Sequence, residues 1–277
     1  MEETKLNWRE IYNNPELGKK IGETILKKIK EDGCATTHDG LYHADDVFCM
    51  SLINICINDE IEFIRTREKT PYFTFDVGRG DFDHHHCDEF RKSGDGIFAS
   101  FGKLWCTLGR TLNLREEVWK EIDDQFIRHI DTTDNIGKMN PINYAINATR
   151  YYGTEEDEGF LTARIMADRI LSDIIESGFR KSKELDKFYE ECNNKVDKVL
   201  YLSRHYTVPR EVYKSLGIDW IIYPDLADSG FIIQAVGNKL LPINLSDSND
   251  IIFIHKGRWI CKTKTLEIAK NLLELEK

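Results

Sequence analysis

Short apolar segments alternate with longer amphipathic ones over residues 34–130, and this alternation most constrains the fold. Residues 34–37, 61–66 and 72–75 have the character of strands, whereas residues 47–57, 98–108 and 116–130 have the character of helices. Strands that alternate with helices favour a parallel sheet covered by helices on its faces. Binding sites in such sheets lie beyond the carboxyl ends of the strands, so the residues that follow positions 37 and 75 are of interest.

The chain is long enough for two domains, and the pattern of predicted helices and strands changes near residue 140. Before this point, residues 6–30 also predict a helix. After it we expect helices at 160–176 and 181–202, strands at 218–224, 231–236, 251–255 and 258–261, and a last helix from residue 266. We therefore predict an α/β protein with a junction between 137 and 160. A catalytic domain of mostly parallel sheet would occupy residues 1–140, and a smaller α+β domain with a long helical connector would occupy residues 141–277.

Composition limits the possible partners and compartments. The formal net charge is −10, which disfavours long duplex nucleic acid because binding to it depends on many Lys and Arg contacts to phosphate. The seven cysteines have no regular spacing, which predicts free thiols in a reducing compartment. There is no apolar run of membrane-spanning length and no signal-like N-terminus, so we expect a cytoplasmic protein without a membrane partner.

Four groups of histidine and acidic residues occur in order along the chain. They are His38-Asp39-Gly40-Leu41-Tyr42-His43-Ala44-Asp45-Asp46, then Asp76, then Asp83-His84-His85-His86, and then Asp131-Thr132-Thr133-Asp134. Each group alone has a simpler interpretation: a polar loop with a helix cap, a turn-starting aspartate, a structural polar cluster and a solvated helix end. Together, imidazoles and carboxylates at several chain positions are what a site for two divalent cations needs.

Two cations bridged by a carboxylate would polarise a phosphoryl oxygen and lower the pKa of a bound water molecule. A nearby histidine, His84 or His85, could then form a hydrogen bond with that water or with the leaving oxygen. The clusters therefore predict a metal-dependent hydrolase.

The order of these motifs resembles the DHH phosphoesterase superfamily and, within it, the melanocyte-proliferating-gene exonuclease family. The resemblance rests on residues 37–46, Asp76-Val77-Gly78, Asp83-His84-His85 and residues 130–137, and more weakly on segments 222–225, 234–236 and 252–255 with the terminal helix. It runs from about residue 33 to the end. One departure is that the glycine-rich stretch usual after the late histidine is reduced to Lys256-Gly257.

The resemblance implies a DHH-type catalytic domain and a second domain, with substrate clamped between them. The catalytic residues would be His84, His85 and Asp76. The metal ligands would be His38, His43, Asp45, Asp76, His85 and one of Asp131 or Asp134, holding two Mn²⁺ ions, with Mg²⁺ as the alternative. His255, Lys262 and Lys264 would hold a phosphate or a chain end; a basic surface turn is the alternative interpretation of these three.

The leading hypothesis is a metal-dependent phosphodiesterase, resembling a 3′–5′ exonuclease on RNA or short oligonucleotides. A phosphohydrolase for a small molecule, such as a cyclic dinucleotide, a nucleoside bisphosphate or pyrophosphate, is the second hypothesis. A non-catalytic metal-binding protein is the third, and it is disfavoured because structural sites usually use Cys/His tetrads, which this chain lacks. The oligomeric state, including a homodimer, stays open.

Overall fold

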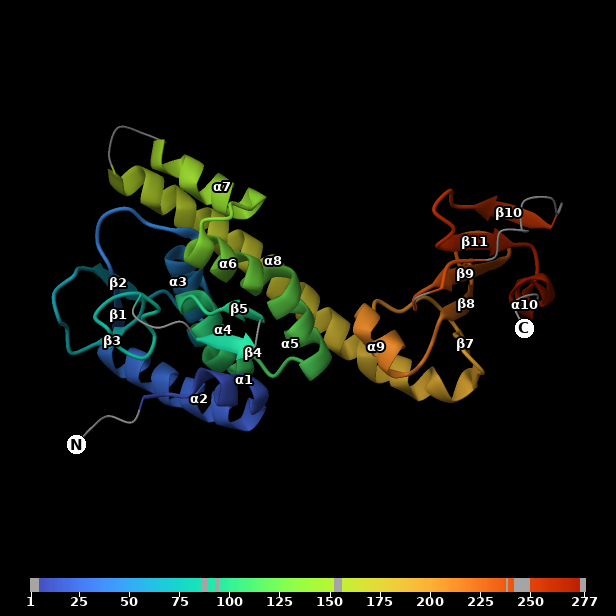
Figure 1. Ribbon diagram of the computed structural model, residues 1–277, viewed down its shortest axis with the longest axis horizontal. Coiled ribbons are helices and arrows are strands. Elements are labelled where there is room, and N and C mark those ends of the chain that lie inside the picture. The colour runs from blue at the N-terminus through green and yellow to red at the C-terminus, as the bar shows by residue number, and fades with distance from the viewer. Residues whose placement is uncertain are drawn as a thin grey trace. The chain divides into compact units, whose positions relative to one another are not determined.

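The computed structural model describes residues 5–85, 89–92, 95–151, 156–237, 239–241 and 250–274. The chain divides into two compact units, Met1–Gly178 and Phe179–Lys277 (Figure 1). The border lies within helix α8 (Glu156–Glu191) and not between 137 and 160. The reason is that α7 (Pro141–Ala148) packs against α3 (Ala44–Ile57) and α6 (Arg128–Ile136) of the first unit, so the segment after residue 140 continues that unit.

The N-terminal unit contains a small parallel sheet in the order β2 (Glu62–Arg65), β1 (Cys34–Thr37), β3 (Phe73–Thr74). In the register, Ala35 of the central strand lies opposite Phe63 on one side and Phe73 on the other. The three strands expected in this region are confirmed, as is their parallel arrangement. Consequently the chain leaves β1 and β3 at the same edge of the sheet.

The helix expected at 6–30 is two helices, α1 (Trp8–Asn13) and α2 (Pro15–Asp32). The break occurs at Asn14, whose side chain accepts a hydrogen bond from the backbone N–H of Leu17 (3.1 Å) and whose successor is a proline, which suits the first helical position. α2 packs closely on α4 (Ser100–Thr111): a Cβ on Gly22 would lie 2.5 Å from the carbonyl oxygen of Thr107.

Helix α3 (Ala44–Ile57) is buried along most of its length and packs against α2, α4, α6 and α7. Further elements complete this unit. These elements are the hairpin β4 (Phe90–Lys92) and β5 (Asp95–Ile97), the helix α5 (Glu116–Ile122), a π-helical turn (Asp123–Ile127) and α6 (Arg128–Ile136). The hairpin was not expected from the sequence.

The C-terminal unit contains a mixed sheet in the order β10-β11-β9-β8-β7-β6, in which β7 and β8 are parallel and the other described neighbours are antiparallel. The strands are β6 (Lys195–Val196), β7 (Val199–Tyr201), β8 (Trp220–Pro224), β9 (Phe231–Ala235), β10 (Ile251–Ile254) and β11 (Ile260–Thr263), with helices α9 (Arg210–Ser215) and α10 (Leu266–Glu274). Trp220, Ile222, Ile233 and Cys261 pack with residues of α10 in its core.

The helix expected at 181–202 is wrong in its second half. Helix α8 ends at Glu191, and β6 and β7 follow after a short 3-10 turn. The β-branched and aromatic residues of β7 extend the sheet, since Val199–Tyr201 pairs with Trp220–Ile222. None of the helices within the described ranges is both long and apolar enough to cross a membrane.

Candidate metal centre

The carboxyl ends of β1 and β3 bring His38 and Asp76 together. The His38 Nε2 atom lies 3.3 Å from Asp76 Oδ2, and the ring Nδ1 is 2.8 Å from the carbonyl oxygen of Asp39. Asp76 adopts a left-handed backbone (φ +58°), a conformation that is unfavourable for a residue with a side chain. Its backbone N–H donates to the carbonyl of Phe82 (3.2 Å), so a loop contact holds this conformation and directs a buried carboxylate to the sheet edge.

The first turn of α3 supplies two further carboxylates, Asp45 and Asp46, which are both buried. Asp46 Oδ2 lies 2.8 Å from His38 Nε2 and accepts a hydrogen bond from the backbone N–H of His43 (3.3 Å). Acidic residues are favourable here because the helix N-terminus carries partial positive charge. Neither carboxylate oxygen of Asp45 has a hydrogen-bond partner among the described residues.

His84 connects the sheet edge with α6. Its Nδ1 atom lies 3.0 Å from Asp76 Oδ1, and its Nε2 atom lies 2.7 Å from Asp134 Oδ2. The Ser100 hydroxyl at the start of α4 donates to Asp76 Oδ1 (2.9 Å) and is 3.1 Å from the same imidazole. The histidine and the serine together fix the orientation of the Asp76 carboxylate.

The donor atoms fall into three sets, each with all its atoms within 4.8 Å of one another. The sets are Asp76 with His84 and His85, His38 with Asp46 and Asp76, and His43 with Asp45 and Asp134. Asp76 belongs to two of the sets. These nitrogen and oxygen donors suit Mn²⁺, Zn²⁺ or Fe²⁺, and they fit the expected cation site.

The electrostatics of the cluster also fit a cation. Burial and then the negative charges of Asp134 and Asp76 raise the pKa of Asp45 well above its usual range. Burial alone would lower the pKa of His38, but hydrogen bonds to Asp46 and Asp76 raise it to about 10. Burial would also lower the pKa of His84, which its carboxylate partners likewise raise to about 10. Buried oxygens without partners and histidines with raised pKa values both indicate an excess of negative charge.

Asp131 and Asp134 have different surroundings, although both lie in α6. Asp131 is fully buried, accepts a hydrogen bond from Arg91 Nη2 (2.6 Å) and another from the backbone N–H of Gly102 (3.0 Å). Asp134 contacts His84 and lies 3.6 Å from His43 Nδ1. Asp134 is therefore the one that joins the cluster of donor atoms.

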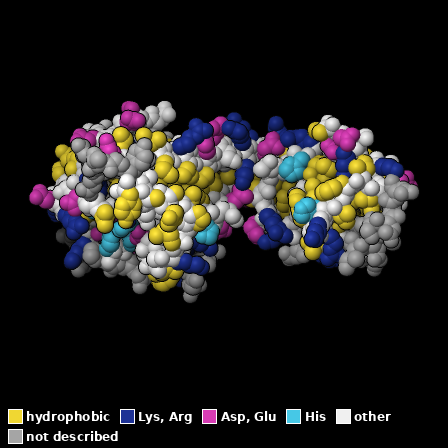
Figure 2. All heavy atoms as spheres, turned by 90° about the horizontal axis from the view of Figure 1, so that it is seen from above, with side chains coloured by type: hydrophobic (Ala, Val, Ile, Leu, Met, Phe, Trp, Pro, Cys, Tyr) yellow, Lys and Arg dark blue, Asp and Glu magenta, His cyan; other side chains and the backbone are white. Residues whose placement is uncertain are grey.

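His43 and His85 lie at the rim of the cluster, with side chains 49% and 47% exposed. His85 Nδ1 is 2.7 Å from Asp83 Oδ1, and this hydrogen bond raises the pKa of His85. Both histidines line an open pocket of about 880 Å³, together with Arg67 and Arg79. Figure 2 shows histidine side chains beside acidic ones on the surface of the N-terminal unit.

The residues expected to bind substrate all lie in the C-terminal unit. Lys262 Nζ is 2.7 Å from Asp225 Oδ2 and 2.8 Å from Asp228 Oδ2, so acidic neighbours already balance its charge. Lys264 Nζ lies 3.6 Å from Asp250 Oδ1. His255 Nδ1 accepts a hydrogen bond from the backbone N–H of Gly257 (3.0 Å). Their proposed contact with a phosphate stays a prediction.

Sequence reasoning did not assign Asp46, Ser100 or Arg91 to the site. Asp46 could have been found, since it follows Asp45 in the same helix turn and a helix N-terminus can direct two adjacent carboxylates inward. Ser100 and Arg91 carry no local signal, because only the tertiary fold brings them to Asp76 and Asp131. His86 lies outside the described residues.

The N-terminal unit is thus an α/β scaffold with histidine and aspartate groups that could hold divalent cations at the edge of a parallel sheet. The chain belongs to the MYG1_exonuc family, described as Uncharacterised protein family (UPF0160), whose model matches residues 34–242. The family name points to exonuclease activity. No curated protein and no solved structure matches the chain.

This family membership corrects the resemblance to the DHH phosphoesterase superfamily, because the matching family is a different one, related by its name to the melanocyte-proliferating gene. The Asp83-His84-His85 string was too short to define a superfamily, since it describes cation ligands that different families can share. The match also ends at residue 242, so segment 252–255 and the terminal helix lie beyond it.

Proposed function

We propose that this protein is a metal-dependent phosphodiesterase that acts as a 3′–5′ exonuclease on short single-stranded RNA or oligonucleotides. The observation that carries the proposal is the convergence of histidines and buried carboxylates beside an open pocket, with some carboxylate oxygens lacking a hydrogen-bond partner within the described ranges. The family name supports nuclease chemistry. The acidic chain suits short substrates, since long duplexes need many basic contacts.

In this proposal His38, Asp46 and Asp76 hold one cation, and His43, Asp45 and Asp134 hold another. Mn²⁺ is the proposed ion because imidazole and carboxylate together suit it. Bound there, divalent cations would supply Lewis acidity toward a phosphoryl oxygen and would lower the pKa of a water molecule.

The histidines have two different roles in the proposal. His84 is a positioning residue, since its two ring nitrogens face Asp76 and Asp134 and keep these carboxylates in place. His85 is the general acid, because Asp83 holds its Nδ1 atom and the ring lies at the pocket. Water attacks phosphorus, the bond from phosphorus to the ester oxygen breaks, His85 gives a proton to that oxygen, and the proton lost by water leaves to solvent.

Single-turnover digestion of a labelled five-nucleotide RNA by metal-stripped protein, with each metal added back, tests the proposal. We expect Mn²⁺ to restore stepwise release of mononucleotides from the 3′ end. Asp76→Asn should reduce the rate by at least about 100-fold, and Asp59→Asn, at an exposed position outside the site, should leave it unchanged. His85→Gln should lower the rate while Mn²⁺ still binds.

The other hypotheses give different results in the same assay. Turnover of pyrophosphate, a nucleoside bisphosphate or a cyclic dinucleotide in preference to RNA would replace the exonuclease by a small-molecule phosphohydrolase. Tight Mn²⁺ binding without turnover of any of these compounds would refute the enzymatic proposal.

A further inference from the structure

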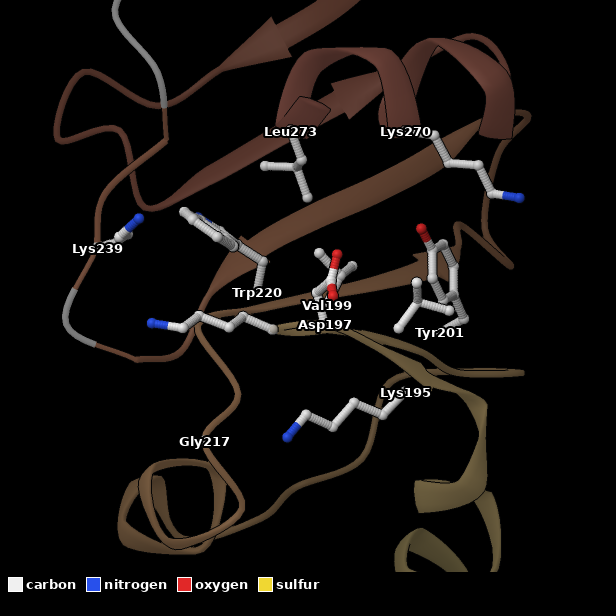
Figure 3. A pocket seen from close by; sticks show the side chains of 11 residues that line it. Lys195, Asp197, Val199, Tyr201, Gly217, Trp220, Lys239, Lys270 and Leu273 are labelled. Carbon is white, nitrogen blue, oxygen red and sulfur yellow. The ribbon is translucent and has the colours of Figure 1, made fainter. Parts of the chain in front are cut away.

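A second pocket, of about 660 Å³, lies in the C-terminal unit and has no part in the proposed catalysis (Figure 3). Its apolar lining includes Val199, Trp220 and Leu273, which come from β7, β8 and α10. Its volume is in the range of small-molecule sites. Because strands β6, β7 and β8 and the terminal helix α10 form it, the pocket is part of the folded unit and not of a surface loop.

Lysines surround this apolar lining. The lining includes Lys195 and Lys198 from the β6–β7 segment, Lys239 from the segment after β9 and Lys270 from α10, whereas Asp197 is the one acidic residue among the lining residues. Figure 3 shows the side chains of Lys195, Lys239 and Lys270 around Trp220, Val199 and Leu273. Lys198 Nζ lies 3.4 Å from Asp219 Oδ2, which leaves Lys195, Lys239 and Lys270 against Asp197. In a chain with a formal net charge of −10, this local excess of positive charge favours an anionic ligand.

Two of these lysines are associated with aromatic rings. Lys239 Nζ lies 5.3 Å from the ring centroid of Trp220, and Lys270 Nζ lies 5.2 Å from that of Tyr201. The indole N–H of Trp220 is buried and has no hydrogen-bond partner among the described residues. Aromatic rings beside ammonium groups, with a buried donor, suit a ligand that combines a flat apolar ring, hydrogen-bond acceptors and a phosphate.

We propose that this pocket binds a nucleoside phosphate, either free or as one residue of a single-stranded oligonucleotide. The lysine ammonium groups neutralise the phosphate, and the base lies against the apolar lining formed by Trp220, Val199 and Leu273. The inference does not depend on the metal centre, since no residue of the pocket belongs to that cluster.

Calorimetric titration of the full chain with AMP, adenosine, inorganic phosphate and a five-nucleotide RNA, all in EDTA, tests the inference. EDTA and an Asp76→Asn background prevent metal binding and turnover, so failure here is separate from failure of the proposed catalysis. We expect AMP to bind more tightly than adenosine or phosphate alone, and its affinity to fall as salt is raised. Preference for the RNA over AMP would indicate the oligonucleotide as the source of the ligand, and equal affinity would indicate the free nucleotide.

The double variant Lys239→Gln/Lys270→Gln should weaken AMP binding by about tenfold, since each exposed charge pair contributes modestly. Lys20→Gln/Lys30→Gln, which removes two exposed lysines of α2, is the matched control and should bind as the parent does. Equal AMP affinity in the two double variants, no AMP binding at millimolar concentration, or phosphate binding as tightly as AMP would each overturn the inference. Unchanged thermal unfolding of both variants verifies that they are folded.

Discussion

Asp45→Asn should stabilise the metal-free protein and destabilise the metal-loaded protein. Both carboxylate oxygens of Asp45 are buried and have no hydrogen-bond partner in the part of the chain that the structure describes, and burial followed by the charges of Asp134 and Asp76 raises its pKa. At a pH above both pKa values, ionisation of such a group opposes folding by about 1.4 kcal/mol for each unit by which the folded-state pKa exceeds the unfolded one. An amide removes that charge, although its own buried polar atoms cost about 1–3 kcal/mol when unpaired.

The sign of the effect depends on pH. A carboxyl group whose folded-state pKa is raised supports folding at acidic pH, and this contribution is lost as the pH rises from the unfolded value of 3.8 through the folded one. Below pH 4 the variant should therefore have no advantage. At pH 8, in EDTA, we expect a gain of about 1–2 kcal/mol, which raises the unfolding temperature by about 2–8 °C for a unit of this size.

Addition of Mn²⁺ should reverse the order of stability, so that the parent protein becomes more stable than Asp45→Asn. A ligand at a concentration of a hundred times its dissociation constant stabilises the folded state by about 2.7 kcal/mol. We expect Mn²⁺ to stabilise the parent in this way and to have almost no such effect on Asp45→Asn. Thermal unfolding by circular dichroism, at pH 4 and pH 8, with EDTA or Mn²⁺, measures all four conditions. Asp59→Asn is the control. A variant that is less stable than the parent in EDTA at pH 8, or that gains as much from Mn²⁺, would refute the reasoning.

Three further outcomes follow from the same contacts. Because His38 and His84 have pKa values raised to about 10 without metal, Mn²⁺ affinity should rise between pH 6 and pH 9, and titration in buffers of different ionisation enthalpy should reveal proton release. Gly22→Ala should destabilise the protein by about 1–3 kcal/mol in urea unfolding through a clash with α4, whereas Gly80→Ala, which meets no atom within 4 Å, should cost far less. Arg91→Met should cost about 3–5 kcal/mol in the same assay, since it removes the buried cation that pairs with both Asp123 and Asp131; a loss below 1 kcal/mol would contradict the pairing.

Part of the fold and of the site was accessible from sequence because it depends on local patterns. The strand character around residues 34–37 and 72–75 predicted a parallel pair, and parallel strands necessarily deliver His38 and Asp76 to one edge. The turn of α3 after His43 could be expected for the same reason, since acidic residues begin helices.

The rest depended on partners that are distant in the chain. Asp131 and Asp134 have helical spacing that allows both to face one point, yet Arg91 from the hairpin engages Asp131. The hairpin itself, Phe90–Lys92 with Asp95–Ile97, is too short to give a periodic signal. The charge-rich segment before Val199–Tyr201 predicts a helix that continues through these residues, whereas pairing with β8 makes them a strand.

The two buried basic side chains near the cluster, Arg91 and Lys103, have partners of their own, which explains why the carboxylates of the cluster need a bound cation. Arg91 is paired with Asp123 and Asp131, and Asp131 also accepts a hydrogen bond from the backbone N–H of Gly102 in α4. Lys103 Nζ donates to the carbonyl oxygens of Asp81 (3.0 Å) and Asp83 (3.1 Å), which fixes the loop that carries His84. Both cations therefore stabilise the scaffold and already have partners, and the buried carboxylates of Asp46 and Asp76 at the sheet edge contact the imidazoles of His38 and His84 instead. Burial of this negative charge in a fixed geometry lowers the stability of the folded protein, and a bound divalent cation would offset that loss.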